Sequence, residues 1–273
     1  MSELIERPES QVPAFMAGDG AIGTEGLIEI IQPPRIKIVQ KAAGSDVLGK
    51  FDVGDIILSP QMIPLVPIGG KLAQKGPIWH FCPIFYYLEW CLWNPIELKG
   101  NKRVIEERTC DPASPMVTKA RDPKLRAELI PGEVDEKGNP LSRRYVEHIN
   151  FVSVFLDEHD IGETPIVLSF SRGDHFSGSN FAALIKMRQA AIFGCRFQAN
   201  AALRPDPRND WYGIDVENPS DRQPWVTADQ YDRFKNLYQQ LSEAHSKGIL
   251  KTEYEEPESA EANRQADANE SEF

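Results

Sequence analysis

The chain has 273 residues, of which 41% are hydrophobic and 26% are charged, so it has enough apolar side chains to bury a sizeable core. Four cysteines in a chain of this length exclude a disulfide scaffold, and no apolar run is long enough to predict a membrane-spanning helix. The N-terminal segment lacks the basic start and apolar run of a secretory signal. The composition therefore predicts a globular, cytoplasmic protein without membrane contact.

The net charge of −11 is distributed unevenly along the chain. Between Lys251 and Phe273 there are eight acids and two bases, a net charge of −6, so the other 250 residues carry −5. A folded body this close to neutral can hold a basic groove on one face, although the whole protein is acidic.

The first half of the chain predicts strands separated by irregular segments. Residues 1–33 are rich in Pro, Gly and Glu and predict a flexible arm. Ile36 and Ile38 then alternate with basic residues, which predicts a half-buried strand. Further strands are predicted over residues 55–58 and 62–68.

The segment 77–93 is unusually aromatic and contains Pro83, a composition that favours one long or bent strand over a helix. It is followed by residues 99–142, which combine charges with Pro- and Gly-rich turns. We expect residues 99–142 to form an insertion that is a long loop or mobile flap.

The second half of the chain predicts both strands and helices. A helix is predicted between Ser177 and Ala191, with Ser177 or Ser179 as its N-cap, and an amphipathic helix between Thr227 and Gly248. Strands are predicted over residues 144–156, 164–170, 193–202 and 211–216. The pattern predicts a mainly β, α+β fold: one OB-like β-barrel domain over residues 34–250, with a C-terminal helix.

Catalytic motifs are not evident in the sequence. It lacks a phosphate-binding loop, a Gly-x-Ser-x-Gly elbow and a His-Glu-x-x-His helix. Carboxylates that suit a metal-dependent nuclease are Asp157, Asp160, Asp215 and Glu217, although a solvated turn and a strand edge explain them as well. Candidate zinc ligands are His80, Cys82, Cys91 and Cys110, but their spacing is typical of packed interior groups. We therefore expect no enzyme activity, no metal and no cofactor.

Binding of single-stranded nucleic acid fits the pattern better, because it needs aromatic faces for the bases and cations for the phosphates. The candidate stacking residues come from the aromatic strand and are Trp79, Phe81, Phe85, Tyr87 and Trp90. The candidate phosphate contacts are Arg35, Lys37, Arg143, Arg144, Arg172, Lys186, Arg188 and Arg196. Each of these aromatic residues is also compatible with a place in the core, and each of these basic residues with a solvated face.

The last part of the chain, residues 251–273, is too polar to fold alone and predicts a disordered acidic tail. Such a polyanion can occupy a cationic groove in place of a nucleic acid. The terminal Phe273, together with Glu270 and Glu272, suits a pocket on a partner protein. A purely solubilising tail accounts for the charge but not for the terminal aromatic residue.

The acidic tail ending in Phe resembles the tails of single-stranded DNA-binding proteins of bacteria and T7-like bacteriophages, whose cores are OB-folds. The segment PPRIKIVQ at residues 33–40 and the later TPIVLSFSR resemble a poorly characterised family of phage proteins associated with replication or recombination. The first resemblance covers only the tail and the second covers residues 33–245.

These resemblances imply a protein that binds single-stranded DNA without strong sequence preference, and whose tail recruits replication or recombination proteins. Two alternatives stay open: a metal-dependent nuclease or recombination enzyme, and an acidic interaction protein that acts on a host enzyme without binding DNA. The sequence leaves homo-oligomerisation open.

Overall fold

The structure is a computed structural model that describes residues 32–41, 45–59, 63–64, 78–95, 104–135, 137–156, 165–205, 210–252 and 254. Its strands are β1 (Arg35–Ile38), β2 (Ile56–Ser59), β3 (Ile63–Pro64), β4 (Trp79–Trp93), β5 (Ile105–Thr109), β6 (Ala127–Val134), β7 (Pro140–Leu156), β8 (Pro165–Ser171), β9 (Phe197–Arg204) and β10 (Trp211–Glu217). Its helices are α1 (Ser45–Leu48), α2 (Pro115–Arg121), η3 (Arg172–Asp174), α3 (His175–Met187), η4 (Ile192–Gly194) and α4 (Ala228–Ser246).

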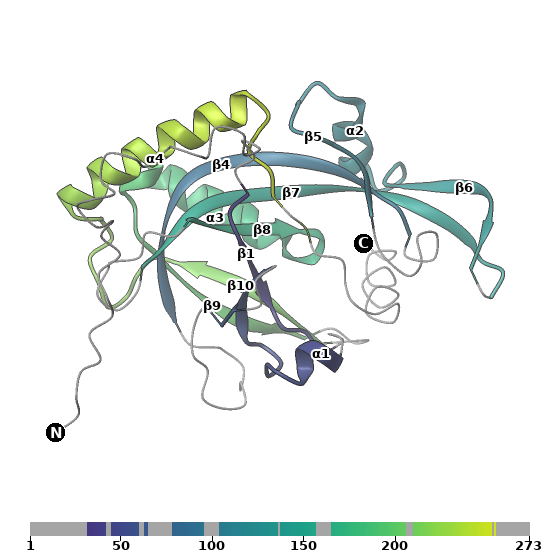
Figure 1. Cartoon of the computed structure of the whole chain (residues 1–273), viewed down its shortest axis with the longest axis horizontal. Coiled ribbons are helices and arrows are strands. Elements are labelled where there is room, and N and C mark those ends of the chain that lie inside the picture. The colour runs from purple at the N-terminus through teal and green to yellow at the C-terminus, as the bar shows by residue number, and fades with distance from the viewer. Residues whose placement is uncertain are drawn as a thin grey trace, which may run out of the picture.

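The described strands form one sheet with the order β10-β9-β4-β7-β8-β1-β2-β3, while β5 pairs with β4 and β6 pairs with β7. The long strands β4 and β7 arch across the molecule and curl the sheet into a half-barrel (Figure 1). The fold is mainly β with a few helices and is OB-like, which confirms the predicted class.

The pairing of β4 with β7 forms the middle of the sheet. The two strands run antiparallel from the pair His80–Leu156 to the pair Trp93–Arg144. The register shifts between Pro83 and Phe85, where proline has no N–H to donate to the ladder. The single long or bent strand predicted from the aromatic segment is therefore confirmed, with its irregularity at the proline.

Side chains alternate between the two faces of this sheet, and each face is covered by a helix. On one face, here called the α3 face, Phe151 of β7 packs against Phe181 of α3 with ring centroids 4.4 Å apart. Gly178 lets α3 approach the sheet closely, because a Cβ at this position would lie 2.6 Å from the Cβ of Phe170. On the other face, the α4 face, Phe234 and Leu241 pack with valines of β7 and β8.

The termini of α4 agree with the sequence prediction. The Thr227 side chain accepts a hydrogen bond from the Gln230 backbone, and the Gln230 side chain accepts one from the Thr227 backbone, which is a capping box. Gly248 follows the helix with φ of +70°, a conformation that favours glycine. By contrast, α3 begins at His175, with Asp174 as its N-cap, and so starts before the predicted Ser177 or Ser179.

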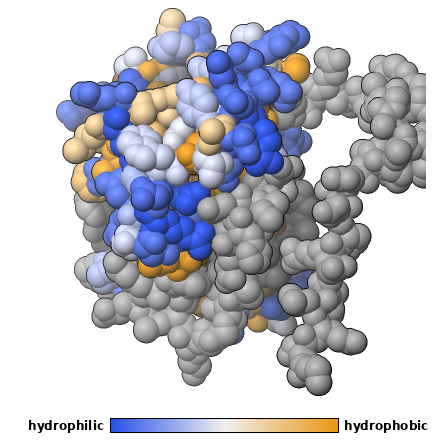
Figure 2. All heavy atoms as spheres, turned by 90° about the vertical axis from the view of Figure 1, so that its left-hand side faces the viewer, coloured by the Kyte–Doolittle hydropathy of each residue, from blue (hydrophilic) through white to orange (hydrophobic). Residues whose placement is uncertain are grey.

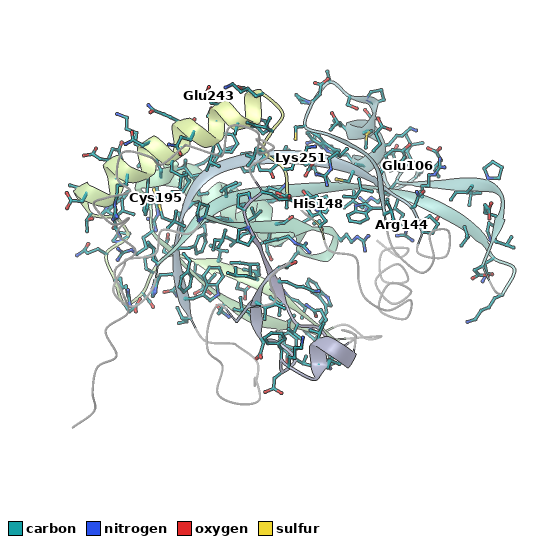
Figure 3. All side chains as sticks on the ribbon, in the orientation of Figure 1. Glu106, Arg144, His148, Cys195, Glu243 and Lys251 are labelled. Carbon is teal, nitrogen blue, oxygen red and sulfur yellow. The ribbon has the colours of Figure 1, made fainter. Side chains whose placement is uncertain are left out.

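The expectation of a loop or flap over residues 99–142 is wrong for the described part of that segment, because it contains β5, α2 and β6. Helix α2 begins after Ser114, whose side chain accepts a hydrogen bond from the Met116 backbone, and Pro115 is its first residue. Met116 and Ala120 of α2 pack on Trp90, so the insertion is stabilised by the same sheet. In Figure 3, the labels Glu106 of β5 and Arg144 of β7 show where the insertion joins the end of the sheet.

The start of the acidic tail also differs from the prediction. Thr252 and Tyr254 are buried on the α4 face, although they lie within the segment predicted to be disordered. The Tyr254 hydroxyl donates to Glu89 at 2.5 Å and accepts from Asn150 at 2.8 Å, and its ring stacks on His148 at 4.0 Å. Figure 3 shows His148 below the chain that leaves α4 at Lys251. Composition alone does not detect this anchor, because one aromatic residue barely changes the average polarity.

We predict that Tyr254→Phe lowers the free energy of unfolding by about 1–3 kcal/mol, because the buried Glu89 and Asn150 lose a hydrogen-bond partner. Urea denaturation followed by tryptophan fluorescence measures this change. Tyr231→Phe is the matched control, since Tyr231 is 38% exposed and should change stability by less than about 0.5 kcal/mol. Equal stabilities of the two variants would show that the Tyr254 hydroxyl does not anchor the chain.

Candidate functional site

A cavity of about 340 Å³ opens on the α3 face where three parts of the chain meet. Its floor is β7, which contributes Tyr145 and Glu147. One wall is the end of α2 and the turn after it, with Arg121 and Arg126, and the other wall is the β8–α3 corner, with Arg172 and His175. We call this the Glu147 pocket.

Glu147 organises the pocket by accepting hydrogen bonds from three donors on different elements. The Trp90 indole N–H and the Arg121 Nε both donate to Oε2 at 2.7 Å, and His175 Nε2 lies 3.0 Å from Oε1. The side chain of Glu147 is only 10% exposed, whereas those of Arg121 and His175 are 56% and 41% exposed. The carboxylate therefore fixes two solvent-accessible side chains from opposite walls.

The electrostatics of Glu147 follow from these contacts. Burial by itself would raise the pKa of the carboxyl, but the hydrogen bonds from His175, Arg121 and Trp90 outweigh it and lower the pKa to about 2. Glu147 is consequently ionised at neutral pH, and its charge is already shared among its three donors.

The arginines of the pocket outnumber its carboxylate by three to one. Arg126 Nε donates to the Ala120 carbonyl at 3.2 Å, and Arg121 Nε is used by Glu147. Within the described residues, the terminal nitrogens of both side chains have no hydrogen-bond partner. Arg172 has a left-handed backbone with φ of +51°, an uncommon conformation for a residue with a side chain. The lining of the pocket thus contains more cationic than anionic side chains.

An exposed aromatic side chain lies on the same face beside the pocket. Tyr86 of β4 is 40% exposed, and its ring packs on Phe151 at a centroid distance of 5.1 Å. Burial and then the negative charge of Glu147 raise the pKa of Tyr86, so its hydroxyl lies within electrostatic reach of the pocket. Phe176, which follows His175 in α3, is 74% exposed.

The aromatic residues predicted to stack on bases are turned into the protein instead. Trp79, Phe81, Tyr87 and Trp90 are each less than 5% exposed. Phe85 is partly buried and packs against Tyr87, Tyr238 and His245. The structure therefore does not present these five residues as open stacking faces, because helices cover both faces of the sheet.

The structure does not bring the predicted phosphate contacts together. Arg172 alone among them lines the Glu147 pocket. Arg143 forms an ion pair with Glu106 at 2.8 Å, and Arg35 lies over the Tyr254 ring on the α4 face. Lys186 is exposed on α3, Lys37 and Arg144 are partly exposed, and Arg196 is buried.

Arg188 has a structural role at the other end of the sheet. Its guanidinium donates to the Pro224 carbonyl and to Asn218 Oδ1, and it lies 4.2 Å from the centroid of the Phe197 ring. This end of the molecule faces the viewer in Figure 2, where hydrophilic residues separate the apolar ones. Arg188 therefore packs against its neighbours and does not line the Glu147 pocket.

The candidate metal ligands are also dispersed. Asp215 forms an ion pair with Arg204 at 2.5 Å, and Glu217 lies 3.5 Å from Gln198 Nε2. Across the described part of the chain, no group of three or more His, Cys, Asp or Glu residues is arranged to hold a metal ion, and the four cysteines are free thiols. Asp157 and Asp160 of the nuclease hypothesis lie outside the described residues, as do Glu270, Glu272 and Phe273 of the tail.

Sequence reasoning missed Arg121, Arg126, Glu147 and His175, although one signal was available. Four of the eight residues from Lys119 to Arg126 are basic, and a basic cluster of this density is typical of an anion-binding surface. Glu147 and His175 carry no such signal, because they meet only through the packing of α3 on β7. No helix in the described ranges is both long and apolar enough to cross a membrane.

Comparison of the chain with protein-family models, with curated proteins and with solved structures finds no match in any of the three. A function proposed for the chain therefore depends on its own residues and their geometry.

We predict that Glu147→Gln lowers the free energy of unfolding at pH 7 by about 1–2 kcal/mol, a value reduced for the solvent exposure of its partners. The folded pKa of Glu147, about 2, lies below its ordinary value of 4.5, so its charge stabilises the fold above pH 4.5 and this contribution is lost as the pH falls toward 2. The difference between wild type and variant should thus shrink between pH 7 and pH 3 in urea titrations.

Glu243→Gln is the control for this experiment, because Glu243 is an exposed residue of α4 whose partner is Lys247. It should have little effect at either pH. A Glu147→Gln difference that is constant between pH 7 and pH 3 would contradict the assigned pKa shift.

Proposed function

We propose that the protein binds single-stranded DNA, without strong sequence preference, on the α3 face around the Glu147 pocket. The observation that carries the proposal is the convergence of Arg121, Arg126, Arg172 and His175 in one cavity next to the exposed ring of Tyr86. Single strands are bound by this combination of cations for the phosphates and aromatic faces for the bases. The proposal keeps the predicted ligand and replaces most of the predicted residues.

The charge balance of the protein supports a local electrostatic site. The whole chain carries −11, yet the segment Lys119–Arg126 has four bases and one acid, Asp122. Tyr145 keeps the nearest lysine in place, since Lys119 Nζ lies 2.7 Å from the Tyr145 hydroxyl and 3.1 Å from Glu128. A cluster of cations of this kind attracts a polyanion locally even though the protein as a whole is acidic.

The tail belongs to the same proposal in a second role. The acidic residues after Tyr254, with Glu270, Glu272 and Phe273 at the end, suit the recruitment of replication or recombination proteins. The resemblance to phage and bacterial single-strand binders supports this role. Because Tyr254 is part of the core, the segment available to a partner begins after it.

A salt titration tests the electrostatic part of the proposal. We expect a fluorescent 30-nucleotide strand to bind at low salt, and the double variant Arg121→Ala/Arg126→Ala to bind more weakly. Because log K falls with log salt by about 0.7 per phosphate contact, the slope for the double variant should be less steep than that of the wild type by about 1.4. Fluorescence anisotropy measures both quantities.

The control is Arg233→Ala/Lys235→Ala on α4, which removes the same charge from a helix on the opposite face. Its salt slope should match that of the wild type, and far-UV circular dichroism checks that both variants fold. No binding at low salt would refute DNA binding, whereas equal slopes for the two double variants would refute the location of the site.

A second prediction tests the aromatic part. Replacing Tyr86 by Leu should weaken binding by about 1–3 kcal/mol, because a base loses its stacking face, whereas Tyr86→Phe should retain the affinity. The same anisotropy assay at fixed salt compares the two variants. If the Tyr86→Leu and Tyr86→Phe variants bind the strand with equal affinity, Tyr86 is not a stacking residue.

A further inference from the structure

The Glu147 pocket differs from an open groove in its shape. Its volume of about 340 Å³ lies at the lower end of the range for small-molecule sites, and it is bounded by β7, by the end of α2 and by the β8–α3 corner. A strand that runs along the surface touches the rim of such a cavity with its internal phosphates. A group at the end of a chain, or a small free molecule, can enter it more deeply and be contacted by more of the lining side chains than an internal phosphate can.

The charge inside the pocket also exceeds what one internal phosphate needs. Three arginines and one carboxylate line the pocket, so the formal charges of its lining side chains sum to +2 before any contribution from His175. An internal phosphodiester carries one negative charge. A terminal phosphomonoester carries about −1.5 to −2 at pH 7 and has three strong acceptor oxygens.

The hydrogen-bond donors are positioned for such a group. Glu147 already accepts hydrogen bonds from Trp90, Arg121 and His175, so it holds Arg121 and His175 in place. A phosphate can therefore bind beside Glu147 without breaking these bonds. Arg121 and Arg126 direct their bonded Nε atoms toward the protein, and their terminal nitrogens have no partner among the residues described here. Guanidinium groups bind phosphate oxygens in pairs with planar geometry.

We infer that the Glu147 pocket binds a terminal phosphate, a phosphomonoester dianion, with Arg121, Arg126 and Arg172 as its ligands. This inference rests on the single-strand binding proposed above and adds that the protein recognises an end of the strand. A phosphomonoester dianion is present in a 5′-phosphate, a 3′-phosphate and a free nucleoside monophosphate. The experiments below distinguish these three ligands.

The test compares 30-nucleotide strands of one sequence that carry a 5′-phosphate, a 3′-phosphate or only hydroxyl ends, with the dye attached at an internal base. We expect at least one phosphorylated strand to bind the full-length protein about tenfold more tightly than the hydroxyl-ended strand. Equal affinity for all three strands would overturn the inference while leaving the proposed function intact.

Two variants in the same turn test whether the preference for a phosphorylated end arises in this pocket. Arg126→Ala should reduce the tenfold preference to less than about threefold, whereas Lys124→Ala, which removes a neighbouring exposed charge that does not line the pocket, should preserve it. Loss of the preference in both variants, or in neither, would overturn the assignment to this pocket. Far-UV circular dichroism of Arg126→Ala confirms that the variant is folded.

A competition experiment separates this inference from the proposed function. Adenosine monophosphate should displace the phosphorylated strand, and adenosine should not. If no strand binds but the monophosphate raises the melting temperature of the wild type and not of Arg126→Ala, the pocket chemistry stands and DNA binding fails. If the monophosphate neither displaces a bound strand nor changes the melting temperature, the terminal-phosphate inference is wrong.

Discussion

The antiparallel pairing of β4 with β7 is the constraint on which both faces of the sheet depend. Each step along this ladder turns a side chain to the opposite face, so the pair Trp90–Glu147 faces α3 and the next pair, Glu89–His148, faces α4. Two carboxylates from adjacent positions are thereby buried on opposite sides. A shift of the register by one residue would turn one strand over relative to the other and bring both carboxylates to the same face.

The two faces of the sheet shift the pKa of their buried carboxyl groups in opposite directions. Glu147 is held by three donors, and its pKa is lowered to about 2, whereas burial raises the pKa of Glu89 above its usual value despite the nearby Arg108 and the hydroxyl of Tyr254. Burial likewise lowers the pKa of His148, with Arg35, Arg172 and Arg108 adding to the effect. The α4 face thus disfavours charge and is closed by Tyr254, while the α3 face keeps charge accessible to solvent.

The strands and helices could be predicted largely from the sequence, but the directions of their side chains could not. The alternation of Ile36 and Ile38 predicts β1, and Thr227 and Gly248 predict the two ends of α4, as the structure confirms. The sequence predicts that aromatic residues of β4 are open for stacking, which requires that one face of the sheet is solvated. An antiparallel sheet often has one solvated side, but here α3 and α4 cover opposite faces, so these rings pack in the core.

The binding site was harder to predict because it depends on the corner between β8 and α3. Gly173 in that corner lies against Trp211, so a Cβ there would come within 2.9 Å of the indole ring. The preceding Arg172 adopts its left-handed conformation, which costs on the order of 1–3 kcal/mol and persists only where the surrounding packing enforces it. The same corner brings His175 to Glu147. Arg172 and His175 thus line the pocket from the same corner, and no local sequence pattern reveals that this corner meets β7 and α2.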